Sequence, residues 1–90
     1  MKVKGGVVLA GLRPEIKSAL PVIEKAFQAL DLEMVVTSTT DDSPPRDNPA
    51  HRQGRAVDLR AHQVNPFLLP LLRRYMEQAL GSKWSIKAVL

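Results

Sequence analysis

The chain has 90 residues, 44% hydrophobic and 24% charged, with 13 basic and 9 acidic side chains and a formal net charge of +4 at pH 7. This length supports one small domain with a thin core. The absence of cysteine excludes disulfide bonds, cysteine zinc ligands, iron–sulfur clusters and thiol catalysis. No apolar run approaches the roughly 18 residues of a membrane-spanning helix. We therefore expect no membrane partner, and the N-terminus also lacks the pattern of a secretory signal.

The first half of the chain predicts an extended segment, a helix and a strand. Residues 1–10 are read as the extended segment. Pro14 suits the first position of a helix, and apolar residues then recur at steps of four and three on one face (Ile16, Leu20, Ile23, Phe27, Leu30). Pro21 lies inside this stripe, so we expect one kinked helix that ends at residues 31–33. The β-branched run 34–38 predicts a strand.

The second half predicts a long loop, a strand, a helix and a final strand. Residues 39–50 are polar and rich in proline, as in functional or mobile loops, and residues 56–60 follow as a strand. Asn65 can cap a helix from Pro66 to Leu80, which Gly81 ends. Residues 84–90 are strand-like. We therefore expect an α+β fold in which two main helices pack on a small antiparallel sheet.

A carboxylate inside an otherwise apolar strand indicates a metal site. Asp58 requires a cation or several hydrogen-bond donors if it is buried. His51 precedes it by seven positions, and imidazole and carboxylate are both ordinary zinc ligands. Gly54 allows a close backbone approach that would bring His51 toward Asp58, and Ala56 leaves space beside an ion. A neighbouring guanidinium would satisfy Asp58 equally well.

The pattern His51-x-x-Gly54-x-Ala56-x-Asp58 resembles the signature of zinc peptidases of the D-alanyl-D-alanine carboxypeptidase and L-alanyl-D-glutamate endopeptidase type, which act on peptidoglycan stem peptides. Further segments are similar to small phage-encoded members, so the resemblance covers nearly the whole chain (11–16, 19–23, 35–38, 54–60). It implies a single domain over residues 1–90 with a zinc-peptidase-like core. It also implies that His51 and Asp58 are two of three zinc ligands.

The chain departs from this family at two places. The family has a serine two positions before the histidine, where this chain has Pro49. The family's general base and third ligand lie in a Glu-x-x-His-x-His segment, which follows a strand similar to residues 84–90. We therefore expect the domain to be truncated here, with its catalytic base beyond Leu90. His62 is a poor third ligand, since a strand that continued from Asp58 would separate the two by about 13 Å.

The resemblance implies that Ser38 and Thr39 lie at the rim of a substrate cleft, although a satisfied strand terminus explains them equally well. Arg46 and Arg55 suit a substrate carboxylate, and solvated surface charge explains them too. The expected partner is a peptidoglycan stem peptide. The apolar final strand is also suited to pairing with another chain. A nucleic-acid partner rests on net charge alone, so we do not expect one.

These features predict a zinc-dependent peptidoglycan peptidase domain of phage or prophage origin, incomplete in these 90 residues. It would be found in the bacterial cytoplasm or in a virion and would act at the cell wall. The alternative is a catalytically inactive relative that serves as a structural or wall-binding component of a virion.

Overall fold

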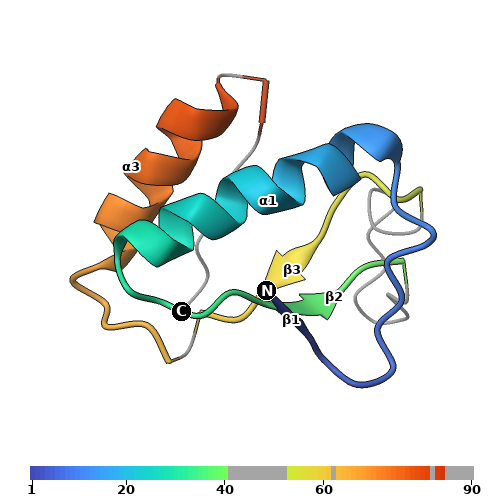
Figure 1. The fold of residues 1–90 in the computed structure, drawn as a ribbon, viewed down its shortest axis with the longest axis horizontal. Coiled ribbons are helices and arrows are strands. Elements are labelled where there is room, and N and C mark those ends of the chain that lie inside the picture. Colours follow the sequence, from blue (N-terminus) through green and yellow to red (C-terminus); the bar gives the residue numbers. More distant parts are fainter. Residues whose placement is uncertain (41–52, 62, 82, 85–90) are drawn as a thin grey trace.

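The computed structural model describes residues 1–40, 53–61, 63–81 and 83–84. Within them the chain forms β1 (Lys2–Val3), α1 (Pro14–Ala29), β2 (Val35–Ser38), β3 (Asp58–Leu59) and α3 (Leu69–Leu80). The two helices lie together on one side of a small sheet (Figure 1). The fold is therefore α+β, as predicted. The expected strand at 84–90 lies outside the described residues except for Trp84, which packs against the core.

The sheet is mixed, and the expectation of an antiparallel sheet is wrong for one of its two pairings. The strand order is β1-β2-β3. β1 pairs with β2 in parallel, with Lys2 opposite Val35 and Val3 opposite Val36. The reason is the connection: α1 carries the chain back along the sheet before β2 begins, and such a crossover returns the second strand in the direction of the first. β2 and β3 are antiparallel.

α1 is one helix of 16 residues that continues through Pro21. Pro14 occupies its first turn, as predicted, and the apolar stripe is its buried face (Ile16, Ala19, Leu20, Ile23, Ala26, Phe27). The helix ends in a Schellman motif, in which the N–H of Leu32 donates to the Phe27 carbonyl at 2.9 Å and the N–H of Asp31 donates to the Gln28 carbonyl at 3.0 Å. Asp31 adopts a positive φ of 57° to make this turn.

α3 begins three residues later than the sequence predicts. The Asn65 side chain does accept the Phe67 N–H at 3.0 Å, but residues 66–68 form a turn rather than α-helix. Pro70 explains the delay, because it has no N–H to donate to the Pro66 carbonyl four residues earlier. Leu69 instead donates to that carbonyl at 3.4 Å. Gly81 ends the helix with a φ of 85°, as predicted.

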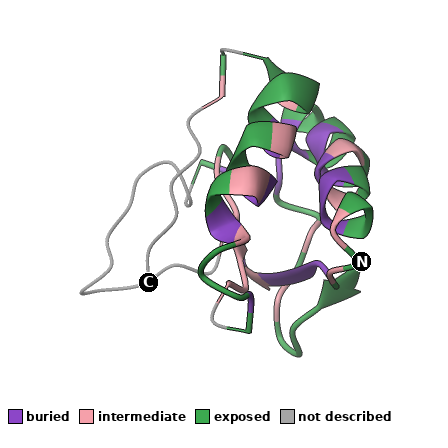
Figure 2. Ribbon diagram, turned by 90° about the vertical axis from the view of Figure 1, so that its left-hand side faces the viewer, coloured by how far each residue is buried: buried purple, intermediate pink, exposed green. Residues whose placement is uncertain are grey.

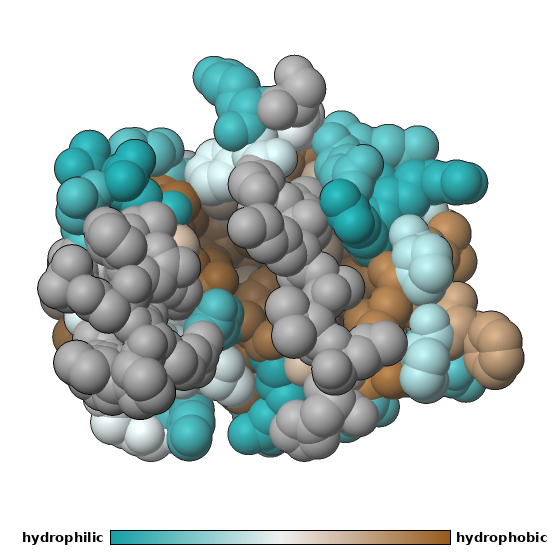
Figure 3. Space-filling model, turned by 180° about the vertical axis from the view of Figure 1, so that it is seen from behind, coloured by the Kyte–Doolittle hydropathy of each residue, from teal (hydrophilic) through white to brown (hydrophobic). Residues whose placement is uncertain are grey.

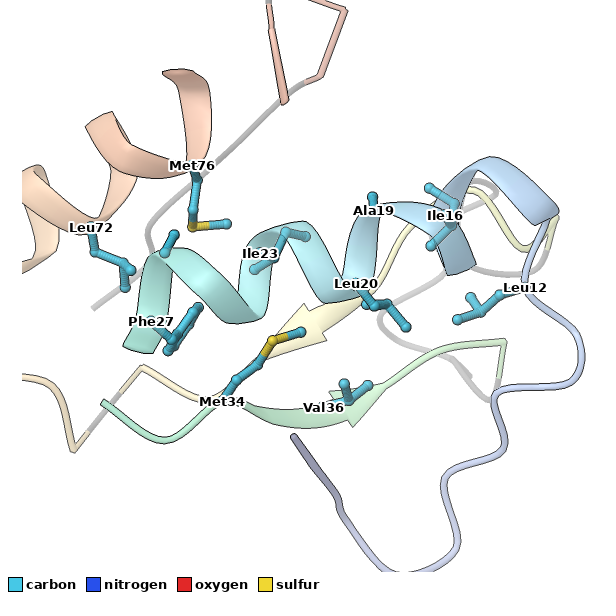
Figure 4. Packing of buried hydrophobic residues seen from close by; sticks show 11 residues of the cluster. Leu12, Ile16, Ala19, Leu20, Ile23, Phe27, Met34, Val36, Leu72 and Met76 are labelled. Carbon is cyan, nitrogen blue, oxygen red and sulfur yellow. The ribbon is translucent and has the colours of Figure 1, made fainter. Parts of the chain in front are cut away.

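The core lies between the two helices and β2. Figure 4 shows Leu20, Ile23 and Phe27 of α1 extending toward Met34 and Val36, while Leu72 and Met76 reach in from α3. Val36 has no exposed surface, and Met34 and Phe27 are each 2% exposed. Exposed positions cover the outer sides of both helices (Figure 2). The core therefore holds α1 against the sheet, and the helix begins on the side of the molecule toward which β2 points (Figure 1).

Candidate metal and substrate site

Asp58 is the first residue of β3 and stands opposite Ser38, the last residue of β2. It is partly buried. The Thr37 hydroxyl donates to its backbone carbonyl at 3.3 Å, and the Arg60 N–H donates to the Val35 carbonyl at 2.9 Å. These contacts fix Asp58 at the end of the sheet.

A β-bulge brings Ser38 opposite Asp58. Val36 is opposite Leu59, so regular antiparallel pairing would place Thr37 opposite Asp58. The register instead shifts between Val36 and Ser38. Bulges re-aim side chains and are over-represented near active sites. No residue pattern within β2 predicts this register shift, so the pairing of Ser38 with Asp58 is seen only in the structure.

Ser38 and Thr39 are both buried, at 7% and 0% exposure. The Thr39 hydroxyl donates to the Val8 carbonyl at 2.6 Å. This bond ties the chain after β2 to the segment between β1 and α1. Of the two residues expected at a substrate cleft, Ser38 therefore stands opposite Asp58, and Thr39 follows it in the chain with its hydroxyl bonded to the backbone.

Gly54 packs directly against the start of α1. Its φ is +73°, and a Cβ atom built on it would lie 2.3 Å from the Gly11 carbonyl oxygen and 3.2 Å from the Arg13 nitrogen. The Arg13 N–H donates to the Gly54 carbonyl at 2.9 Å, and the Arg13 Nε donates to the Gln53 carbonyl at 3.1 Å. Only glycine satisfies both the backbone angle and the close approach.

Gly11 also contacts the chain that leaves β2. A Cβ atom on Gly11 would lie 3.0 Å from Thr40 Cγ2 and 3.1 Å from Thr40 Oγ1. Thr40 and Gly54 therefore both meet the segment that precedes α1. We call residues 8–13 the clasp, because they contact the chain on both sides of residues 41–52. Gly11 and Arg13 belong to a segment that resembles the peptidase family, and no pattern in the sequence predicts this role.

The remaining candidates are distributed unevenly. Arg55 is exposed and follows Gly54 directly. His51, His62 and Arg46 lie outside the described residues. Two acidic side chains elsewhere form ion pairs on the surface. Glu33 Oε2 lies 3.3 Å from Lys2 Nζ, and Glu77 Oε1 lies 2.7 Å from Arg73 Nε.

The described residues by themselves do not complete a metal site. Among them, no group of three His, Cys, Asp or Glu side chains is arranged to hold an ion. Asp58 is the one proposed zinc ligand that they contain. As a carboxylate it fits the zinc donor set, and a zinc site that included it would need its other ligands from outside the described ranges.

A separate hollow of about 390 Å³ lies between the two helices. It is mainly apolar and is lined from both helices (Val22, Lys25, Ala26, Ala29, Tyr75, Gln78, Ala79). None of these residues belongs to the sheet or to the clasp.

On the back of the molecule, hydrophobic surface gathers between two groups of hydrophilic side chains (Figure 3). In the described part of the chain, no helix is long and apolar enough to cross a membrane.

Comparison with protein-family models, curated proteins and solved structures finds no match for this chain.

Proposed function

We propose that this chain carries part of a zinc-dependent peptidoglycan peptidase, which hydrolyses an amide bond of a cell-wall stem peptide, with His51 and Asp58 as two of its zinc ligands. The observation that supports this proposal is the meeting of separate sequence segments at one end of the sheet. Gly11 and Arg13 contact Gly54, and Ser38 stands opposite Asp58. Each of these residues belongs to a segment that resembles the peptidase family.

The chemistry assigns a role to each candidate. Zinc in such a site acts as a Lewis acid on the scissile carbonyl. Asp58 would hold the ion from the first position of β3. Ser38 and Thr39 would border the substrate on the adjoining strand end, and the exposed guanidinium of Arg55 is suited to a stem-peptide carboxylate. The general base that accepts a proton from water is expected beyond Leu90.

An inactive relative that serves as a structural or wall-binding virion component is the alternative. It is favoured by one feature of the sequence: the 90 residues contain two histidines and no Glu-x-x-His-x-His segment. Zinc sites in proteins normally use three or four protein ligands. A chain that keeps only two would bind the ion weakly and would lack the base for hydrolysis.

The test is a zinc titration of the ¹⁵N-labelled chain followed by NMR, which detects weak binding and locates it. We expect zinc to shift the amide signals of Ser38 and Asp58. Asp58→Asn and His51→Ala should abolish the shifts. Asp31→Asn removes an exposed carboxylate at the end of α1, and His62→Ala removes the other histidine, so both controls should bind zinc like the wild type.

Hydrolysis of a stem peptide is then measured with the full reading frame, because the base is expected beyond Leu90. Hydrolysis that is lost in His51→Ala and Asp58→Asn supports the peptidase. Zinc binding without hydrolysis supports the inactive alternative. Hydrolysis that survives both substitutions, or a wild-type chain that zinc does not perturb, refutes the proposed zinc site.

A further inference from the structure

The segment that leads into Asp58 is held at both of its ends. At its C-terminal end, the Thr37 hydroxyl donates to the Asp58 carbonyl and the Arg60 N–H donates to the Val35 carbonyl. At its N-terminal end, Arg13 holds two consecutive residues: its N–H donates to the Gly54 carbonyl and its Nε donates to the Gln53 carbonyl. The three residues between Gly54 and Asp58 therefore connect two fixed points.

Arg13 is well placed to act as an anchor because its own backbone is fixed. It is the N-cap residue of α1, and its carbonyl accepts the N–H groups of Ile16 and Lys17, each at 3.0 Å. The next turn of this helix is rooted in the core through Ile16 and Leu20. A group supported by a rigid element positions its partner better than one on a loop.

We propose that Arg13 is a positioning residue of the candidate metal centre, which fixes the backbone at Gln53 and Gly54 and so sets the approach of the chain to Asp58. This inference rests on the proposed function. The guanidinium is exposed, so its hydrogen bond adds little to global stability. It restricts the freedom of the residues that lead to the ligand, and residues that orient a metal ligand commonly alter metal affinity about tenfold when removed.

The variant that tests this role is Arg13→Met, which keeps the long apolar stem and removes the Nε donor. Its backbone N–H can still bond Gly54, so the fold is retained. We expect zinc affinity to fall about tenfold, and the zinc-induced shift of the Asp58 amide to shrink, while the melting temperature stays close to that of the wild type. Amide exchange at Gly54 and Asp58 should become faster.

The matched control is Arg73→Met. Arg73 is also exposed and also uses its Nε in one hydrogen bond, to Glu77 at 2.7 Å on α3. It should leave zinc affinity unchanged. Leu72→Val, a core substitution on the same helix, serves as the second control, since it lowers stability without touching the clasp. If it weakens zinc binding as much as Arg13→Met does, a general loss of stability is the cause and the positioning role is refuted.

The outcomes separate the two proposals. A wild-type chain that binds no zinc refutes the proposed function and this inference with it. A wild-type chain that binds zinc, together with an Arg13→Met variant of equal affinity, refutes the positioning role and leaves the proposed function intact.

Discussion

Gly54 meets Gly11 so closely that a Cβ atom on Gly54 would lie 2.3 Å from the Gly11 carbonyl oxygen. These residues are far apart in the sequence, and their contact joins the chain before β3 to the chain before α1. The obstructing atom belongs to the backbone and cannot rotate away. Gly54→Ala must therefore move one of the two segments in addition to straining a positive φ.

We expect Gly54→Ala to lower the free energy of unfolding by at least about 2 kcal/mol. Urea denaturation followed by circular dichroism measures the change. Two glycines provide graded controls. Gly6 has a φ of +87° with nothing within 4 Å of a built Cβ, and Gly5 has neither constraint. Gly6→Ala should cost about 1 kcal/mol for the backbone angle alone, and Gly5→Ala should cost almost nothing. Equal losses at Gly6 and Gly54 would show that the contact with Gly11 is unimportant.

The features that the sequence predicted correctly depend on residues close together along the chain. The apolar stripe of α1 follows from its spacing, Pro14 opens the helix, and Gly81 ends α3 with a positive φ. The late start of α3 also has a local cause, the missing N–H of Pro70, although the sequence predicts a helix that begins at Pro66.

The features that the sequence did not predict depend on contacts between distant segments. The parallel pairing of β1 with β2 requires knowing that the strand before α1 and the strand after it are neighbours in one sheet. The bulge that brings Ser38 opposite Asp58 has no signature within β2. The clasp depends on the fit of Gly11 against both Thr40 and Gly54. The spacing of His51, Gly54, Ala56 and Asp58 identified Asp58 as a candidate ligand. The residues around Asp58, Ser38 and Thr37, are brought there by the fold.

Asp31 closes α1 with a φ of 57°, a conformation that glycine adopts more easily than aspartate. Its negative charge also lies at the C-terminal end of the helix, where the dipole disfavours it. Asp31→Gly should therefore raise the free energy of unfolding by about 1 kcal/mol and the melting temperature by about 4–8 °C. Differential scanning calorimetry measures both.

Asp31→Asn separates the two causes, because asparagine removes the charge and keeps a Cβ atom. We expect it to give a smaller increase than Asp31→Gly. If glycine leaves the melting temperature unchanged or lower, the Schellman turn does not strain the aspartate.

Pro21 lies exposed inside α1, where it cannot donate to the Lys17 carbonyl. Pro21→Ala should restore that hydrogen bond and stabilise the protein by about 1–3 kcal/mol. The gain would be seen in urea denaturation, together with greater helical ellipticity at 222 nm. Pro14→Ala is the control, since proline is favourable in the first turn, and it should be neutral or slightly destabilising. A loss of stability in Pro21→Ala would contradict this expectation. It would mean that Pro21 stabilises the protein more, by restricting the unfolded chain, than the missing hydrogen bond destabilises it.

Thr39 allows the structural and the substrate roles of its hydroxyl to be compared. It has no exposed surface, and its hydroxyl donates to the Val8 carbonyl at 2.6 Å. Thr39→Val keeps the volume and removes the donor, so we expect a loss of about 1–3 kcal/mol in the free energy of unfolding.

Thr37→Val is the same substitution two positions earlier, where the hydroxyl is less buried and its hydrogen bond to the Asp58 carbonyl is longer, at 3.3 Å. The loss in the free energy of unfolding should therefore be below about 1 kcal/mol. If Thr39→Val keeps full stability but weakens stem-peptide binding, the hydroxyl acts on substrate rather than on the clasp. If it loses stability as expected, the hydrogen bond to Val8 is what joins β2 to the clasp.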